Sequence, residues 1–212
     1  YMEILDRLFY IVAVIPIIIF IFWPIVALFL RSISPDGKFT LELYNSLFKE
    51  NFTVIRNSIL VCLLSTALSV IIGTVIAVYI SYASKWVKRM LMLLLMLTMI
   101  SPPFLSSHSY ILLFGKRGII TADLLHLNFN PYGWHGIVIM QTFSEISLAA
   151  LILTGGLSSI PSSVIEAAKD LGSKSGEILY RVILPMLKSS LTAVFFLIFV
   201  KNIADFGTPI IV

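Results

Sequence analysis

The stretch VIEAAKDLGSKSGEILYRVILP, residues 164–185, is polar and helix-forming, and it lies between two strongly apolar parts of the chain. The chain has 212 residues, of which 58% are hydrophobic and 12% are charged. Soluble domains have about 25% charged residues, so this chain lacks the polar surface that a soluble protein of its size needs. Its mean hydropathy of +1.00 indicates a membrane protein. The polar stretch therefore has a task outside the lipid.

Long apolar runs predict an all-α membrane bundle. A helix needs about 20 residues to cross about 30 Å of hydrocarbon. Five runs are close to or above that length: 8–30, 55–80, 90–114, 136–156 and 187–204. The first is too long for the apolar part of a signal peptide. We expect residues 1–54 to form an N-terminal span with an extracytoplasmic loop, and 55–212 to form the main helical domain.

Small side chains recur at every fourth position of the second run. They are Ser65, Ser69, Gly73, Ala77 and Ser81. Such residues share one face of a helix, and small faces let helix backbones approach closely in lipid. The pattern predicts a packing surface rather than a substrate path.

The third apolar run contains the sequence Ser101-Pro102-Pro103. Each proline removes a backbone donor and disfavours helix at the residue before it, so we expect a break there. His108 follows among serines, and two interpretations stay open for it. It either lines a path through the membrane or makes a hydrogen bond near a helix end.

Three ionisable residues lie within apolar runs: Glu145, Lys201 and Asp205. A charge at the bilayer centre costs roughly 2.5–3.5 kcal/mol on insertion scales, so these side chains should face the protein interior or the headgroups. Lys201 and Asp205 are four residues apart and could pair with each other, although Lys before Asp is the weaker order. The alternative is that all three line a translocation path. Gly207 and Pro209 predict a helix break beside Asp205.

The polar stretch 164–185, with the residues just before it, is predicted to form two short helices joined at a glycine corner. Ser163 and Glu166 have the spacing of a capping box, and Gly172 suits the left-handed position after a helix end. Ser173 or Ser175 could begin the second helix, with Glu177 in its first turn. The segment 172–176 is not a phosphate loop, because three residues separate its glycines and Glu177 occupies the position of the required lysine.

The same stretch resembles a known family. Glu166-Ala167-Ala168, then Gly172, then Ile183-Leu184-Pro185 are similar to the EAA motif of permease subunits in binding-protein-dependent ABC importers of the type I fold. Asn57-Ser58 at the start of the second run, with Gly73 and Ala77 further in, is similar to the start of that family's transmembrane domain. The resemblance covers most of the chain.

This resemblance implies that residues 157–188 form a cytoplasmic coupling loop. Glu166, Ala167, Ala168 and Gly172 would contact a separate ATPase dimer, which holds the ATP and magnesium, and no cofactor or metal is expected in this chain. The other implied partners are an extracytoplasmic substrate-binding protein, a second permease bundle and the lipid of the cytoplasmic membrane.

The basic triplet Lys85, Lys88 and Arg89 favours a cytoplasmic N-terminus. The dispersed net charge of +4 argues against nucleic acid.

Two further stretches resemble permeases for ferric iron. They are Pro102-Pro103-Phe104 with Ile111–Gly115 and Gly118, and the sequence Ala204-Asp205-Phe206-Gly207-Thr208-Pro209. Those permeases commonly fuse two bundles in one chain, so we expect this sequence to be the N-terminal half of a longer protein, with a sixth span missing. Permeases for aminophosphonates and polyamines share much of the pattern.

Two other classes of protein would account for part of this sequence. An ion-coupled secondary transporter could use Glu145 or Asp205, but it leaves the EAA motif unexplained. A membrane-embedded enzyme needs a nucleophile–base pair or a metal cluster, and His108, His126 and His135 are not at ligand spacing. The sequence therefore favours a transport subunit without enzymatic activity of its own.

Overall fold

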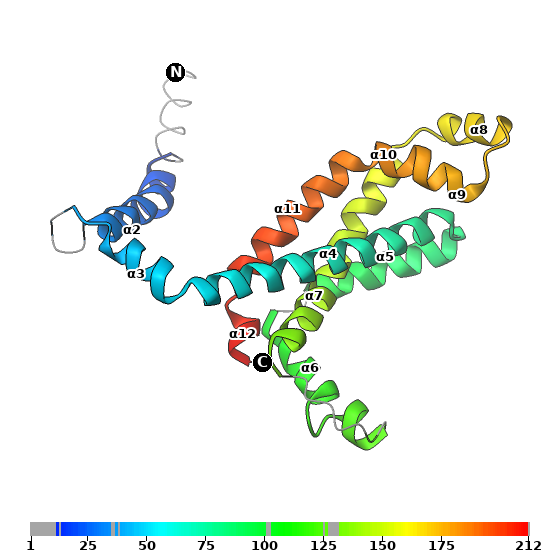
Figure 1. Ribbon diagram of the computed structural model, residues 1–212. Coiled ribbons are helices and arrows are strands. Elements are labelled where there is room, and N and C mark those ends of the chain that lie inside the picture. The colour runs from blue at the N-terminus through cyan, green and yellow to red at the C-terminus, as the bar shows by residue number, and fades with distance from the viewer. Residues whose placement is uncertain are drawn as a thin grey trace, which may run out of the picture. The chain divides into compact units, whose positions relative to one another are not determined.

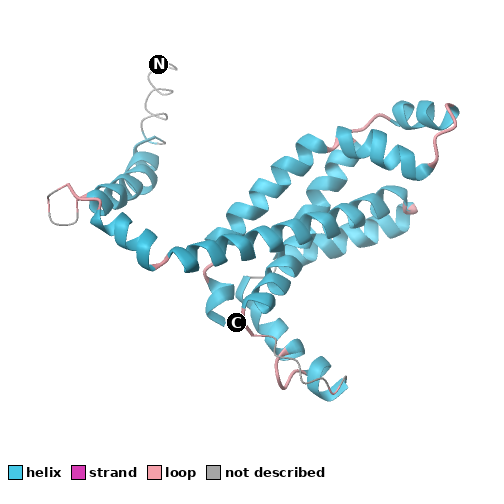
Figure 2. Ribbon diagram, viewed as in Figure 1, coloured by secondary structure: helices cyan, strands magenta, loops and turns pink. Residues whose placement is uncertain are grey.

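The computed structural model of the protein describes residues 12, 14–34, 37, 39–100, 103–124, 126 and 132–211. Every regular element within these residues is a helix (Figure 2), which confirms the predicted all-α fold. The chain divides into two compact units, Tyr1–Arg56 and Asn57–Val212. The candidate site lies in the second unit.

The first unit contains a spanning helix of 20 residues, Val14–Ile33, none of which is buried within the chain. Such exposure suits a helix that is surrounded by lipid. The start of the predicted run, residues 8–11, lies outside the described residues. The elements of this unit are the π-helical stretch η1 (Ile18–Phe22), α2 (Trp23–Ile33) and α3 (Glu42–Glu50). A hydrogen bond of 2.7 Å between the Ser32 and Tyr44 hydroxyls joins α3 to the end of α2.

The second unit is built around three long helices, α4 (Phe52–Tyr82), α7 (Trp134–Ser158) and α11 (Lys188–Ala204) (Figure 1). α4 begins in the first unit and continues into this one. The remaining elements are α5 (Lys85–Ile100), α6 (Pro103–Phe114), η2 (Ile119–Leu124), α8 (Ser162–Asp170), α9 (Ser175–Ile178), η3 (Leu179–Ile183), α10 (Leu184–Met186) and α12 (Gly207–Ile211). α8 and α9 lie near the start of α11, and α12 follows its end, so these elements mark opposite ends of the unit.

The predicted spans are continuous in some places and broken in others. α4 and α7 are each long and apolar enough to cross a membrane, as predicted. In the third run the structure describes α5 up to Ile100 and α6 from Pro103. The break predicted at Ser101-Pro102 falls on residues outside the described ones. The fifth run forms α11, whose 17 residues continue from Ser175–Met186 across a bend of 65°.

The small-residue face of α4 packs against α7, as its spacing predicted. Ser65, Ser69 and Ala77 have no exposed surface, and a Cβ added to Gly73 would lie 2.5 Å from the Cβ of Ala149. Ser81, the last member of the pattern, is exposed. An adjoining apolar core joins α4, α7 and α11. Its buried residues are Ala77, Ala149, Leu153, Val194 and Ile198.

We expect Gly73→Ala to destabilise the bundle by about 1–3 kcal/mol, because the added methyl group has no room and forces α4 and α7 apart. The matched control is Gly155→Ala on α7, where an added Cβ meets no atom within 4 Å. That variant should be as stable as the parent or slightly more stable, since alanine favours a helix interior over glycine. Thermal unfolding of the purified protein in detergent provides the measurement. Equal melting of the two variants would contradict the close packing of α4 on α7.

Candidate functional site

A polar cavity of about 500 Å³ lies between the end of α5, the middle of α7, the end of α11 and the start of α12. Its polar lining comprises Thr98, Gln141, Ser144, Glu145, Lys201, Asn202, Asp205 and Thr208. Three of the four residues predicted to line a path are therefore together in one cavity. His108, the fourth, does not line it and has an exposed side chain in the middle of α6.

An ion pair crosses this cavity from α11 to α7. The Lys201 ammonium lies 2.9 Å from each of the two Glu145 carboxylate oxygens. The Glu145 side chain is only 10% exposed, whereas that of Lys201 is 50% exposed. Lys201 thus neutralises a carboxylate that would otherwise be buried without a counter-charge.

The suggested pairing of Lys201 with Asp205 is wrong. α11 ends at Ala204, and Asp205 has an extended backbone with φ −75° and ψ 104°. Its side chain therefore leaves the helix surface on which residues four apart become neighbours. One Asp205 oxygen, Oδ1, accepts hydrogen bonds from the backbone N–H groups of Gly207 (3.1 Å) and Thr208 (3.2 Å) at the start of α12. The helix break predicted beside Asp205 is present.

Two buried amides that sequence reasoning missed lie beside these charges. Gln141 and Asn202 are each 3% exposed. Gln141 precedes Glu145 by four residues and so shares its face of α7, which was the available signal for Gln141. Asn202 follows Lys201 directly and lies on a different face of α11, so no comparable signal marked it. A polar amide in an apolar span needs a partner, because lipid supplies none.

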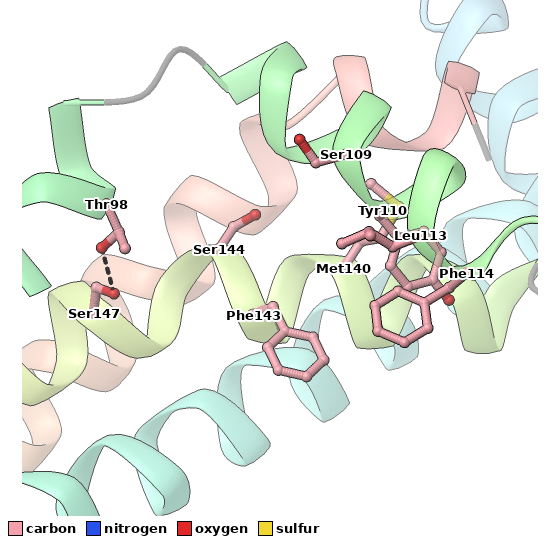
Figure 3. Close-up of a pocket in the computed structure, with 9 residues that line it drawn as sticks. All are labelled: Thr98, Ser109, Tyr110, Leu113, Phe114, Met140, Phe143, Ser144 and Ser147. Atoms are coloured by element: carbon pink, nitrogen blue, oxygen red, sulfur yellow. Dashed lines mark hydrogen bonds between the residues drawn. The ribbon is translucent and has the colours of Figure 1, made fainter. Parts of the chain in front are cut away.

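A second cavity, of about 300 Å³, lies between α5, α6 and α7 (Figure 3). It shares Thr98 and Ser144 with the polar cavity, so the two adjoin. Its other lining residues are Ser109, Tyr110, Leu113, Phe114, Met140, Phe143 and Ser147. A hydrogen bond of 2.7 Å from the Thr98 hydroxyl to that of Ser147 joins α5 to α7. The hydroxyl of Tyr110 is buried without a hydrogen-bond partner in the described part of the chain.

The loop between α7 and α11 has the predicted glycine corner. Gly172 has φ +81° and follows the end of α8. Its N–H donates to the Lys169 carbonyl (2.8 Å), and the Ser173 N–H donates to the Ala168 carbonyl (3.1 Å). These two bonds form a Schellman motif, which satisfies carbonyls at the end of α8.

The helix starts in this loop differ from the prediction. α8 begins at Ser162, with Pro161 in the N-cap position and no side-chain cap, so the capping box of Ser163 and Glu166 is wrong. Proline fixes the backbone dihedral at the helix entrance, which places Ser163 inside the first turn. At α9 the N-cap is Lys174 rather than Ser173 or Ser175, and its N–H donates to the Glu177 carboxylate (3.1 Å).

The four predicted coupling residues do not share one face. Glu166, Ala167 and Gly172 are exposed, whereas Ala168 packs on a buried apolar cluster of Ile178, Ile183 and Leu187. Leu171, at the tip of the loop, is 87% exposed. The loop therefore presents one surface outward and fixes the other to the base of α11.

The described residues contain no group of three or more His, Cys, Asp or Glu side chains placed to hold a metal ion. Their helices enclose a charged cavity at one end of the unit and carry an exposed polar loop at the other. Both features suit a membrane subunit of a transporter, which needs a polar path among apolar helices and a surface outside the lipid.

The chain belongs to the family described as binding-protein-dependent transport system inner membrane components, which matches residues 69–212. This match confirms the resemblance to ABC importer permeases. FbpB 1 of Haemophilus influenzae is 26% identical over 203 residues, which are 92% of this chain and 32% of that protein. The ferric transport system permease protein FbpB of Actinobacillus pleuropneumoniae is 27% identical over 205 residues, 92% of this chain and 29% of that protein.

A third relative is the thiamine transport system permease protein ThiP of Salmonella typhimurium, 29% identical over 160 residues, 73% of this chain and 30% of that protein. The chain thus spans about a third of the length of these three relatives.

Proposed function

We propose that this chain forms part of the membrane path of an ATP-driven importer whose cargo is ferric iron. The supporting observation is the cavity that holds Glu145, Lys201 and Asp205 at the end of α11, far along the helix from the EAA loop. Cargo would pass through this cavity, and the loop would receive the movement of an ATPase.

The charge of the cavity favours a cationic cargo. Two carboxylates and one ammonium among its described lining residues leave a net charge of −1. Glu145 is neutralised by Lys201, while the hydrogen bonds described for Asp205 come from amide groups. A negative cavity attracts cations and repels anions. This argues for ferric iron, the cargo named for the Actinobacillus relative, over aminophosphonates and over the oxyanion molybdate.

The partners of the complete importer are also part of this proposal. An ATPase dimer, which binds ATP and magnesium, docks on the exposed surface of Glu166, Ala167 and Gly172. Ala168 transmits its movement to α11 through the apolar cluster. An extracytoplasmic binding protein delivers the cargo, and a second permease bundle, in the same polypeptide or a separate one, completes the path. The N-terminus lies in the cytoplasm.

We expect the complete importer, reconstituted in vesicles, to take up radioactive iron(III) only when ATP and the ATPase are on the cytoplasmic side. Unlabelled molybdate, an aminophosphonate, thiamine and a polyamine are the competitors, and none should displace iron. A vesicle with the ATPase omitted is the control.

If one of these compounds displaced iron(III), that compound would be the cargo and the proposal of ferric iron would be wrong. Uptake that needs an ion gradient and no ATP would instead show a secondary transporter.

A further inference from the structure

Gln141 links three helices at the level of the polar cavity. Its side-chain oxygen accepts a hydrogen bond from the Ser65 hydroxyl on α4 (2.8 Å). Its amide nitrogen donates to the Asn202 carbonyl on α11 (3.3 Å) and to Oδ2 of Asp205 (3.5 Å). Both ends of the amide are therefore used, and every described bond reaches another helix.

Asn202 fixes the last turn of α11 against α4. Its side-chain nitrogen donates to the hydroxyls of Ser65 (3.2 Å) and Thr66 (3.0 Å). The Asn202 carbonyl, near the helix end where α-helical partners run out, accepts bonds from Gln141 and from the Asp205 N–H (3.3 Å). The backbone carbonyl of Asn202, which the helix break leaves without an α-helical partner, thus has hydrogen-bond donors within the protein. Such donors are required where a helix breaks at membrane depth.

The two oxygens of Asp205 have different tasks at this break. Oδ1 caps the first turn of α12 through the N–H groups of Gly207 and Thr208. Oδ2 faces Gln141. The contact of Oδ2 with the Gln141 amide nitrogen, at 3.5 Å, joins the carboxylate to α7, while the bond from the Asp205 N–H to the Asn202 carbonyl joins its backbone to α11.

We propose that Gln141 is a positioning residue for transport, which holds the Asp205 carboxylate and the break between α11 and α12 in place beside the cavity. This inference rests on the proposed function, because Gln141 can affect transport in this way only if cargo passes Asp205. Gln141 acts through Asp205 and does not itself contact the cargo.

The informative substitution is Gln141→Glu, which keeps the shape and the oxygen that accepts from Ser65 but removes the donor to Asp205. The ionisable groups around this position are Glu145 on α7, Lys201 and Asp205 at the end of α11, and the buried Cys62 thiol on α4. When the introduced carboxyl is protonated, it is neutral and can donate to Asp205. When it is ionised, the donor is lost and the two carboxylates repel.

We therefore expect iron(III) uptake by the complete importer carrying Gln141→Glu to fall about tenfold or more as the pH rises, the equivalent of one lost hydrogen bond to a charged group. The double variant Gln141→Glu/Asp205→Asn restores one donor and one acceptor, so this added pH dependence should disappear. Thr154→Val is the control, because the Thr154 hydroxyl on α7 is equally buried but donates to the Ala150 carbonyl of its own helix (2.6 Å). It should leave the pH profile of uptake unchanged.

Hydrogen exchange gives a second measurement that does not depend on the cargo. The backbone amides of Gly207 and Thr208 should lose protection in Gln141→Glu at high pH and keep it in Thr154→Val. If no protein takes up iron(III) while the exchange pattern appears, the proposed cargo is wrong and the positioning role stands. If Gln141→Glu has the parent's pH profile and exchange pattern, or the double variant keeps the added pH dependence, the positioning role is refuted.

Discussion

Gly172→Ala in the coupling loop is expected to lower transport about five- to thirtyfold while the protein still inserts into the membrane normally. Gly172 has φ +81°, and an added Cβ would meet no atom within 4 Å, so the whole effect comes from backbone strain. Alanine in a left-handed conformation costs about 1–2 kcal/mol, and each 1.4 kcal/mol is a factor of ten. Relief of that strain breaks the Schellman bonds and turns α8 relative to α9.

The matched control is Gly176→Ala, in the first turn of α9, where an added Cβ also meets no atom within 4 Å. Gly176 does not have a positive φ, so this variant should transport like the parent. Glu166→Ala is a companion variant that probes the outer surface of α8. Because Glu166 does not cap its helix, its loss should weaken the ATPase complex without unfolding the loop. Uptake and co-purification of the ATPase, measured together, separate coupling from insertion. Parent-like values for both Gly172→Ala and Glu166→Ala would refute the coupling role.

Lys201→Ala is expected to destabilise the bundle and to stop uptake. Removal of the Lys201 ammonium leaves Glu145, whose side chain is 10% exposed, without a counter-charge. Breaking a fully buried pair costs about 3–5 kcal/mol, and we expect about 2–3 kcal/mol here because the Lys201 side chain is half exposed. Thermal unfolding and iron(III) uptake are the measurements.

The double variant Lys201→Met/Glu145→Gln distinguishes stability from transport. It removes both charges, so unfolding should return close to that of the parent, whereas uptake should remain low if the charges serve the path. Lys188→Ala, at the exposed start of the same helix, is the control and should change neither quantity. If Lys201→Ala unfolded at the parent's temperature and took up iron(III) at the parent's rate, the ion pair would serve neither stability nor transport.

Features set by local chemistry could be predicted from the sequence. The spacing of Ser65, Ser69, Gly73 and Ala77 predicted a packed face, which the structure confirms. Gly207 and Pro209 predicted the helix break beside Asp205, and the position of Gly172 after a helix predicted its positive φ. Each depends on residues within one or two helical turns, where physical rules are strong.

Features set by distant residues could not be predicted in the same way. The partner of Lys201 is Glu145, 56 positions earlier in the chain, rather than its close neighbour Asp205. Gln141 and Asn202 carry no motif, and their importance depends on which helices meet. The helix start at Ser162 was missed because Ser163 and Glu166 have capping spacing, while Pro161 determines the actual entrance.

The hydroxyl bonds along α4 bear on how this protein enters the membrane. Ser69 donates to the Ser65 carbonyl of its own helix at 2.7 Å. The Ser65 hydroxyl, which has a single hydrogen, lies 2.8 Å from the Val61 carbonyl of its own helix as well as from the Gln141 oxygen, so it can donate to Val61 before α7 is present. A helix that satisfies its polar groups internally can leave the insertion machinery alone, before any neighbour has arrived. The amides of Gln141 and Asn202 bond only to other helices among their described contacts. The serine face of α4 therefore permits early release into lipid, and the two amides favour assembly once α7 and α11 have followed.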